Sequence, residues 1–260
     1  MTEVVIQSDA DAAATAATLL ADRITRDPEL VLGLATGSSP LHLYRALAER
    51  VTRDGIPMDR LRAFALDEYA GLDPEHPQSY LSTIRREAVE PLGLDPERVH
   101  VPDGSLERLP TAGERYEEAI ALAGGVDVQI LGIGTDGHIG FNEPGSSLAS
   151  RTRIKTLTAQ TRRDNARFFD SPEQVPTHCV TQGIGTILAA GHLLLFASGA
   201  HKADAVARAV EGPVSAGCPA SAIQLHPRVT VFVDEAAASR LEHADYYRAA
   251  YEAKPAWQGL

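Results

Sequence analysis

Short apolar runs alternate with longer segments of helical periodicity along most of the chain. The runs at 30–35 and 126–131 carry almost no charge, which is typical of strands that are covered on both faces. From Leu41 to Val51, apolar residues recur every three or four positions, which predicts an amphipathic helix. Strands that alternate with helices predict an α/β protein with an open, mostly parallel sheet, right-handed crossovers and helices on both faces.

The pattern predicts strands at residues 4–6, 30–35, 61–66, 99–101, 126–131, 193–197, 222–225 and 229–233, and helices at 9–25, 41–53, 79–89, 106–122 and 202–210. Ser8 is the expected N-cap of the first helix, and Ser39 with Pro40 is expected to begin the second. Residues 140–182 are the least regular, and irregular segments of that length are usually functional. No repeat or linker divides the chain, so we expect a single domain over residues 1–260.

Composition narrows the class of protein. The 260 residues are 44% hydrophobic and 23% charged, which excludes a disordered chain. A net charge of −11 repels phosphate backbones, so we expect no nucleic-acid partner. The apolar stretch 12–21 is flanked by acids and is too short to span a bilayer, so we expect neither an export signal nor a membrane partner. The two cysteines, Cys179 and Cys218, cannot hold a chain of this length together, which indicates a reduced, cytoplasmic protein.

Three predicted strands end in residues that carry chemistry, and open parallel sheets bind ligands at the carboxyl ends of their strands. The first such end is the segment Thr36, Gly37, Ser38 and Ser39. Free amides at the start of a helix, together with three hydroxyl groups, favour a phosphate. The segment lacks the Gly-Lys-Ser/Thr ending of a nucleotide P-loop. From these residues alone, a capped turn without a ligand is an equal alternative.

The second strand end carries the neighbouring acids Asp67 and Glu68, followed by Tyr69. Neighbouring side chains on an extended segment point to opposite sides, so one acid can face the ligand while the other faces away. Asp67 could serve as a general base if it reaches a substrate C–H group. A solvated turn or a helix cap is the alternative, and the residue types alone favour it.

The third strand end is the glycine-rich segment 132–144. It contains a G-x-G-x-x-G pattern, but later glycine and proline residues interrupt the helix that a dinucleotide site requires. Asp136 and His138 can face the same way, and Glu143 could orient the ring, which is the arrangement of a histidine general acid/base held by acids. A metal site needs three or four ligands and a single histidine lies nearby, so we expect no metal. A purely structural loop is the weaker alternative.

Basic residues follow the third strand end. An extended segment would place Arg151, Arg153 and Lys155 on one face, as a second anion site or as a solvated strip. Arg167 and Lys202 each lie near a predicted helix or strand end. Either could reach a phosphate, although isolated basic residues usually belong to the surface.

Taken together, these segments resemble glucosamine-6-phosphate deaminases over nearly the full length of the chain. The most specific motif is residues 134–144, continued to Thr158, and residues 66–69, 167–170 and 224–227 add support. Its Asp-Gly-His core is shared with 6-phosphogluconolactonases. The continuation Phe-Asn-Glu-Pro at 141–144 is similar to the deaminases and unlike the lactonases.

The resemblance implies a Rossmann-like domain and a cofactor-free reaction, in which glucosamine 6-phosphate and water become fructose 6-phosphate and ammonia. Asp67 would move a proton between C2 and C1. His138 would assist opening of the sugar ring, with Asp136 and Glu143 in electrostatic support. An active-site lid is expected around residues 157–176. The residues matching the phosphate site are Thr36, Gly37, Ser38, Ser39, Arg167 and Lys202.

Some deaminases of this family are hexamers that N-acetylglucosamine 6-phosphate activates. The resemblance therefore implies a homo-oligomer and an effector site. The residues that match the effector site are Ser146, Ser147, Arg153, Lys155 and Tyr246.

Two other functions compete with this interpretation. A 6-phosphogluconolactonase-like sugar-phosphate hydrolase is the closest, and release of ammonia from glucosamine 6-phosphate distinguishes it from a deaminase. A sugar-phosphate sensor domain of a transcription regulator can share this kind of fold. That function requires a DNA-binding module, whereas the chain opens with a strand and an acidic helix. A sensor function also gives no role to the combination of Asp67 and His138.

Overall fold

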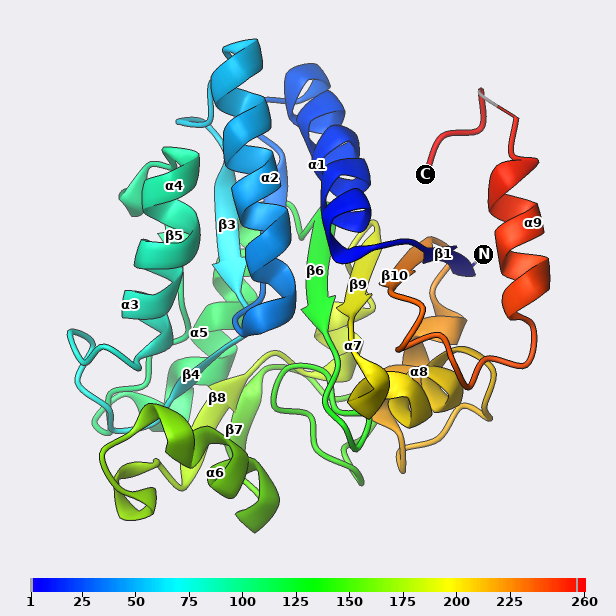
Figure 1. Cartoon of the computed structure of the whole chain (residues 1–260). Coiled ribbons are helices and arrows are strands. Elements are labelled where there is room, and N and C mark those ends of the chain that lie inside the picture. Colours follow the sequence, from blue (N-terminus) through cyan, green and yellow to red (C-terminus); the bar gives the residue numbers. More distant parts are fainter. Residues whose placement is uncertain (1, 256) are drawn as a thin grey trace.

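The structure is a computed structural model of the chain that describes residues 2–255 and 257–260, apart from the side chain of Asp164. Its centre is a seven-stranded sheet in the order β1-β10-β9-β6-β2-β3-β5, in which every pairing is parallel (Figure 1). The strands are β1 (Thr2–Ile6), β2 (Val31–Leu34), β3 (Arg62–Ala65), β5 (Val99–His100), β6 (Val128–Gly132), β9 (Leu193–Ala197) and β10 (Val229–Val233). The predicted open, parallel α/β architecture is confirmed.

Helices lie on both sides of this sheet. α1 and α2 pack side by side in front of it in Figure 1, and α5 and α7 lie behind it. The α-helices are α1 (Asp9–Arg26), α2 (Ser38–Asp54), α3 (Tyr80–Ile84), α4 (Glu90–Leu92), α5 (Leu109–Leu122), α6 (Ala159–Asn165), α7 (Ile184–Ile187), α8 (Ala203–Val210) and α9 (Ala244–Glu252). Ser8 caps α1 as predicted, since its hydroxyl accepts the Asp11 N–H at 3.2 Å. Within the described residues, no helix has the length and apolarity needed to cross a membrane.

The core occupies both faces of the parallel sheet. Every residue of β2, β9 and β10 is buried, as expected for strands with helices on both sides. A smaller apolar cluster of Tyr69, Phe141, Leu157 and Cys179 lies apart from this core. The smaller cluster supports the region where the chain departs from the parallel sheet.

A second sheet lies beyond the carboxyl ends of β3 and β6 (Figure 1). It is antiparallel in the order β4-β8-β7, with bounds β4 (Asp67–Tyr69), β8 (His178–Thr181) and β7 (Arg153–Thr156). The sequence pattern did not predict it, because its strands are short and come from distant parts of the chain. Asp67 pairs directly with Thr181, so this sheet determines where the second predicted strand end lies.

Two local predictions are wrong. Residues 222–225 belong to a 3₁₀ helix, Pro219–Leu225, and not to a strand; a short apolar run fits either a strand or a buried helical segment. Helix α2 begins at Ser38 with Gly37 as its N-cap, and not with Ser39 as N-cap. Gly37 has a φ of 97°, a conformation open to glycine, and this turn lets the helix begin earlier.

Candidate active site

A cavity of about 930 Å³ opens at the carboxyl end of the parallel sheet. All three predicted strand ends contribute to its lining. The predicted site residues that line it are Thr36, Gly37, Ser38, Ser39, Asp67, His138, Arg167 and Lys202. Asp136 and Glu143 are not among the lining residues. Their carboxyl groups lie beside the imidazole of His138, which lines the cavity.

One part of the cavity suits an anion. The turn from Thr36 to Ser39 leads into α2 and lines the cavity. The first N–H groups and the positive dipole end of this helix therefore lie at the cavity wall. Lys202 ends a 3₁₀ turn just before α8, and its ammonium group donates to the Ile133 carbonyl at 2.7 Å. Arg167 lines the cavity from the 3₁₀ turn Ala166–Phe168, with its guanidinium 4.7 Å from the centre of the Phe168 ring. Backbone amides, hydroxyls and two cations therefore share one cavity.

Asp67 is 5% exposed and begins β4. Burial raises the pKa of its carboxyl group to about 8, with a further contribution from the charge of Glu68. Interactions with the Phe141 N–H and the Thr181 hydroxyl partly offset the rise. These two groups also contact each other, since the Phe141 N–H donates to Thr181 Oγ1 at 3.1 Å. A carboxyl group with a pKa near the working pH is suited to both accepting and returning a proton.

Glu68 points away from the cavity, as the alternation of an extended segment predicted. Its carboxylate accepts the N–H groups of Tyr69 at 2.7 Å, Tyr80 at 2.9 Å and Leu81 at 2.9 Å. The second acid therefore has a structural role at the start of α3, and it leaves Asp67 as the acid that faces the cavity.

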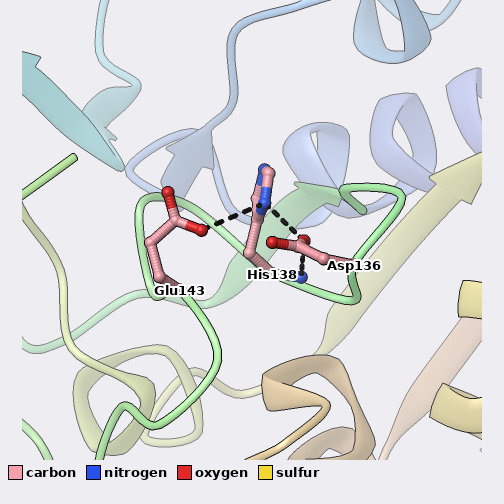
Figure 2. Close-up of side chains that lie close together, drawn as sticks. All are labelled: Asp136, His138 and Glu143. Carbon is pink, nitrogen blue, oxygen red and sulfur yellow. Dashed lines mark hydrogen bonds and ion pairs between the residues drawn. The ribbon is translucent and has the colours of Figure 1, made fainter. Parts of the chain in front are cut away.

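His138 stands between two acids in Figure 2. Its Nδ1 lies 2.7 Å from Asp136 Oδ1 and 3.9 Å from Glu143 Oε2. Contact with His138 holds the pKa of the Asp136 carboxyl group well below its usual range. Because Nδ1 faces the acids, Nε2 is the ring nitrogen left to act toward the cavity. The predicted histidine–acid arrangement is present in the structure.

These three residues are also the group in the described part of the chain that could hold a metal ion. One donor atom from each of Asp136, His138 and Glu143 lies within 4.8 Å of the others. The set would supply three protein ligands, a number found in catalytic metal sites. The same atoms also form a proton-transfer arrangement, in which Asp136 and Glu143 lie against the imidazole of His138.

Several side chains at the site were not found from the sequence. Thr181 contacts Asp67, and the hydroxyl groups of Thr158 and Thr161 contact Glu143. Tyr69 accepts a hydrogen bond from Asn165 at 2.8 Å. Thr158 is the N-cap of α6, and the Thr-x-x-Thr pattern preceding a helix was the one local signal available. The other contacts depend on chain pairing.

The residues that match an effector site are partly gathered. Arg153 and Lys155 share one face of β7, and Arg153 Nη1 donates to the Asn142 side chain at 2.8 Å. Among the described residues, Arg153 Nη2 and the buried Ser146 hydroxyl have no hydrogen-bond partner. Ser147 is exposed nearby in the chain.

Two of the residues predicted to belong to an anion or effector site, Arg151 and Tyr246, lie apart from Arg153 and Lys155. Arg151 precedes β7 and pairs with Glu117, so it does not join Arg153 and Lys155. Tyr246 is 69% exposed on α9, which packs against β1 at the far edge of the large sheet (Figure 1). Within one chain, the structure does not bring Tyr246 to β7.

Comparison with protein families gives one match over most of the chain. A family model described as glucosamine-6-phosphate isomerases/6-phosphogluconolactonase matches residues 7–232. The chain is 59% identical to a glucosamine-6-phosphate deaminase of Bifidobacterium longum (strain DJO10A) over 266 residues, covering 99% of this chain and 98% of the relative. It is 61% identical to the deaminase of Streptomyces avermitilis over 260 residues, covering 99% and 100%.

Solved structures show the same relationship. A monomeric glucosamine-6-phosphate deaminase superposes with a TM-score of 0.88 at 41% identity, covering 92% of this chain and 99% of that one. A 6-phosphogluconolactonase from Trypanosoma brucei superposes with a TM-score of 0.73 at 18% identity, covering 93% and 99%. The second similarity is one of fold.

Proposed function

Because the chain belongs to the glucosamine-6-phosphate isomerase/6-phosphogluconolactonase family, we propose that it is an enzyme, a glucosamine-6-phosphate deaminase. It converts glucosamine 6-phosphate and water to fructose 6-phosphate and ammonia. The observation that carries the proposal is one cavity lined by Asp67, His138 and the turn at residues 36–39, in a chain about 60% identical to deaminases along nearly its whole length. A lactonase has no use for a base beside a carbon acid.

Ring opening is the first step of the proposed mechanism. His138 Nε2 accepts the proton of the C1 hydroxyl group and delivers a proton to the ring oxygen, which breaks the C1–O5 bond. Asp136 and Glu143 stabilise the positive charge on the imidazole and hold its orientation. The product is an open-chain aldehyde with an amino group on C2.

Asp67 performs the second step. Its carboxylate removes the C2 proton while the C2 ammonium group gives a proton to the aldehyde oxygen, which yields an enol-amine, and the resulting carboxylic acid returns the proton to C1. The C2 imine that forms takes up water, and collapse of this adduct releases ammonia and leaves the C2 ketone of fructose 6-phosphate. The pKa of about 8 suits this role, because the group must both accept and donate a proton in one turnover.

The anion-binding part of the cavity would hold the substrate phosphate. We assign this role to the turn from Thr36 to Ser39, with Arg167 and Lys202 as cations. We also assign residues 157–176 as an active-site lid, because Thr161, Asn165 and Arg167 from this segment line the cavity. A single metabolic domain acting on a phosphorylated sugar in the cytoplasm is consistent with these features.

A coupled assay for ammonia and fructose 6-phosphate with the purified protein tests the function. We expect both products in equal amounts from glucosamine 6-phosphate, without added nucleotide. Hydrolysis of 6-phosphogluconolactone without release of ammonia would instead support the lactonase. Binding of the sugar phosphate without turnover would support the sensor.

Activation by N-acetylglucosamine 6-phosphate belongs to the same proposal. Arg153 Nη2 and the Ser146 hydroxyl, which have no hydrogen-bond partner in the described part of the chain, are donors that an anionic effector could use. Substrate titration with and without the effector, alongside a mass measurement in solution, tests both activation and assembly into a homo-oligomer. Arg153→Ala should remove the response. Identical curves with a monomeric mass would contradict both parts.

A further inference from the structure

Of the two acids beside His138, Glu143 is the one whose carboxylate is held by side chains of the proposed lid. It is 3% exposed, and its Oε1 accepts hydrogen bonds from the hydroxyl groups of Thr161 at 2.5 Å and Thr158 at 3.3 Å. Both threonines belong to α6 or to its N-cap. Its other oxygen, Oε2, lies 3.9 Å from His138 Nδ1 and has no hydrogen-bond partner among the described residues.

Asp136 is positioned differently. Its Oδ1 accepts the backbone N–H of His138 at 3.0 Å and lies 2.7 Å from the ring nitrogen of the same residue. The loop itself therefore holds Asp136. Glu143 has a longer side chain and gains its fixed orientation from hydroxyl groups that lie 15 and 18 residues further along the chain.

Fixing one oxygen of a carboxylate determines where the other points. With Oε1 held by Thr161, Oε2 is directed at the imidazole (Figure 2). Without that bond, a side chain with three rotatable bonds would rely on weaker contacts, such as the Thr158 hydroxyl at 3.3 Å and His138 Nδ1 at 3.9 Å. Preorganised charge of this kind lowers the barrier because no reorientation is needed during the reaction.

The same segment contacts the substrate cavity. Asn165 donates to the Tyr69 hydroxyl, and Thr161 and Arg167 line the cavity beside the proposed phosphate site. Docking of α6 and orientation of Glu143 are therefore one structural event. We propose that Thr161 is a positioning residue, whose hydroxyl aims Glu143 at His138 so that ring opening is fully catalysed when α6 is docked. This inference rests on the proposed deaminase function.

The test compares Thr161→Val with Thr161→Ser. Loss of a hydrogen bond to a charged group should lower kcat about 10-fold or more, with KM changed less than about threefold. Thr161→Ser keeps the hydroxyl and should restore most of the rate. Affinity for an acyclic substrate analogue, 2-amino-2-deoxyglucitol 6-phosphate, should not change, because that compound needs no ring opening.

A double-mutant comparison separates positioning from a general effect on the lid. In a Glu143→Gln background, Thr161→Val should have little further effect on kcat, since its action passes through the carboxylate. Thr177→Val is the matched control, because the Thr177 hydroxyl contacts His178 and not Glu143. Its kcat should equal that of the wild type. If Thr161→Val does not fold, Thr161→Ala replaces it in every comparison.

Three results would overturn the inference: an unchanged kcat in Thr161→Val, an equal loss of rate in the Glu143→Gln background, or a parallel loss of affinity for the acyclic analogue. Each of these leaves the deaminase function intact as long as the wild type releases ammonia. A wild type that releases no ammonia contradicts the proposed function instead.

Discussion

At the scale of single residues, the site depends on how one carboxyl group is surrounded. Asp67 lies in an environment that disfavours its charge, and the Thr181 hydroxyl is one of two groups that favour the ionised form. Gly140 makes room for this contact, because a side chain there would lie 3.1 Å from Thr181 Oγ1 and 3.4 Å from Asp67 Oδ2. The acidity of Asp67 is therefore a property of its neighbours.

Removal of the Thr181 hydroxyl should change the pH dependence of catalysis. The proposed base must be ionised, so kcat/KM of the wild type should rise with pH through about 8. Thr181→Val removes a contact that favours the charged form and should move this rise upward in pH. Thr181→Ser should keep the wild-type profile. An unmoved profile in Thr181→Val would separate Thr181 from the acidity of Asp67.

Asp67 should also reduce the stability of the fold at neutral pH. Its folded pKa of about 8 exceeds the ordinary value of 3.8, so the native state binds more protons between these values. The free energy of unfolding therefore falls as pH rises from about 4 to 8, by up to about 1.4 kcal/mol per pH unit. Asp67→Asn removes this dependence and should be more stable than the wild type at pH 8. Urea unfolding of both proteins at pH 5 and 8 measures this change. If the two proteins differ in free energy of unfolding by the same amount at both pH values, the expectation is contradicted.

At the scale of elements, the anion site joins the start of α2 to the turns before α8 and after α6. The helix start supplies amides, and the two turns supply Lys202 and Arg167. Elements that are distant in the chain therefore line the same part of the cavity, which is the proposed phosphate site. Each cation acts from its own turn, so their effects can be measured separately.

Substitution of Lys202 or Arg167 by Ala should weaken apparent substrate binding by about 1.5–3 kcal/mol, the scale of a hydrogen bond between charged groups. Unphosphorylated glucosamine should be a poor substrate for the wild type and should not distinguish the variants from it. The measurement is kcat/KM for both sugars with all three proteins. Equal processing of glucosamine and its phosphate by the wild type would place the phosphate elsewhere.

At the scale of the whole molecule, the opposite end of the sheet carries a second buried titratable group. His192 is fully buried beside β9, and its Nε2 lies 3.0 Å from the Thr230 hydroxyl in β10. Burial is the main cause that lowers the pKa of His192 to about 3, and the nearby cations Arg228 and Arg23 contribute to this value. The native protein therefore keeps this ring neutral in mild acid, whereas the unfolded chain protonates it.

His192 should make the fold sensitive to acid. Because the unfolded state binds the additional proton, the free energy of unfolding should fall as pH decreases from about 6.5 towards 3. His192→Gln cannot titrate and should show a shallower loss across this range. Denaturant unfolding at pH 7 and 4.5 for both proteins measures the change. Parallel losses in the two proteins would exclude His192 as the cause.

The alternation of strands and helices in the large sheet, and the meeting of three strand ends with polar and ionisable residues, could be predicted from the sequence. Hydrophobic periodicity is a local property, and parallel strands place their carboxyl ends at one edge whatever their exact order. The resemblance to deaminases then assigned roles to Asp67 and His138. The direction of Glu68 also followed from local alternation, and its contacts confirm it.

Tertiary structure alone decided the contacts that adjust these residues. The second sheet pairs Asp67 with Thr181, which is 114 residues away, and α6 brings Thr161 onto Glu143. Tyr246, which matches an effector residue of the family, lies away from β7 because α9 packs against β1. Such pairings depend on the closure of long loops and on the packing of distant segments, and a local pattern contains neither. The sequence therefore determined which groups could react, and the folded chain determined their pKa values and orientations.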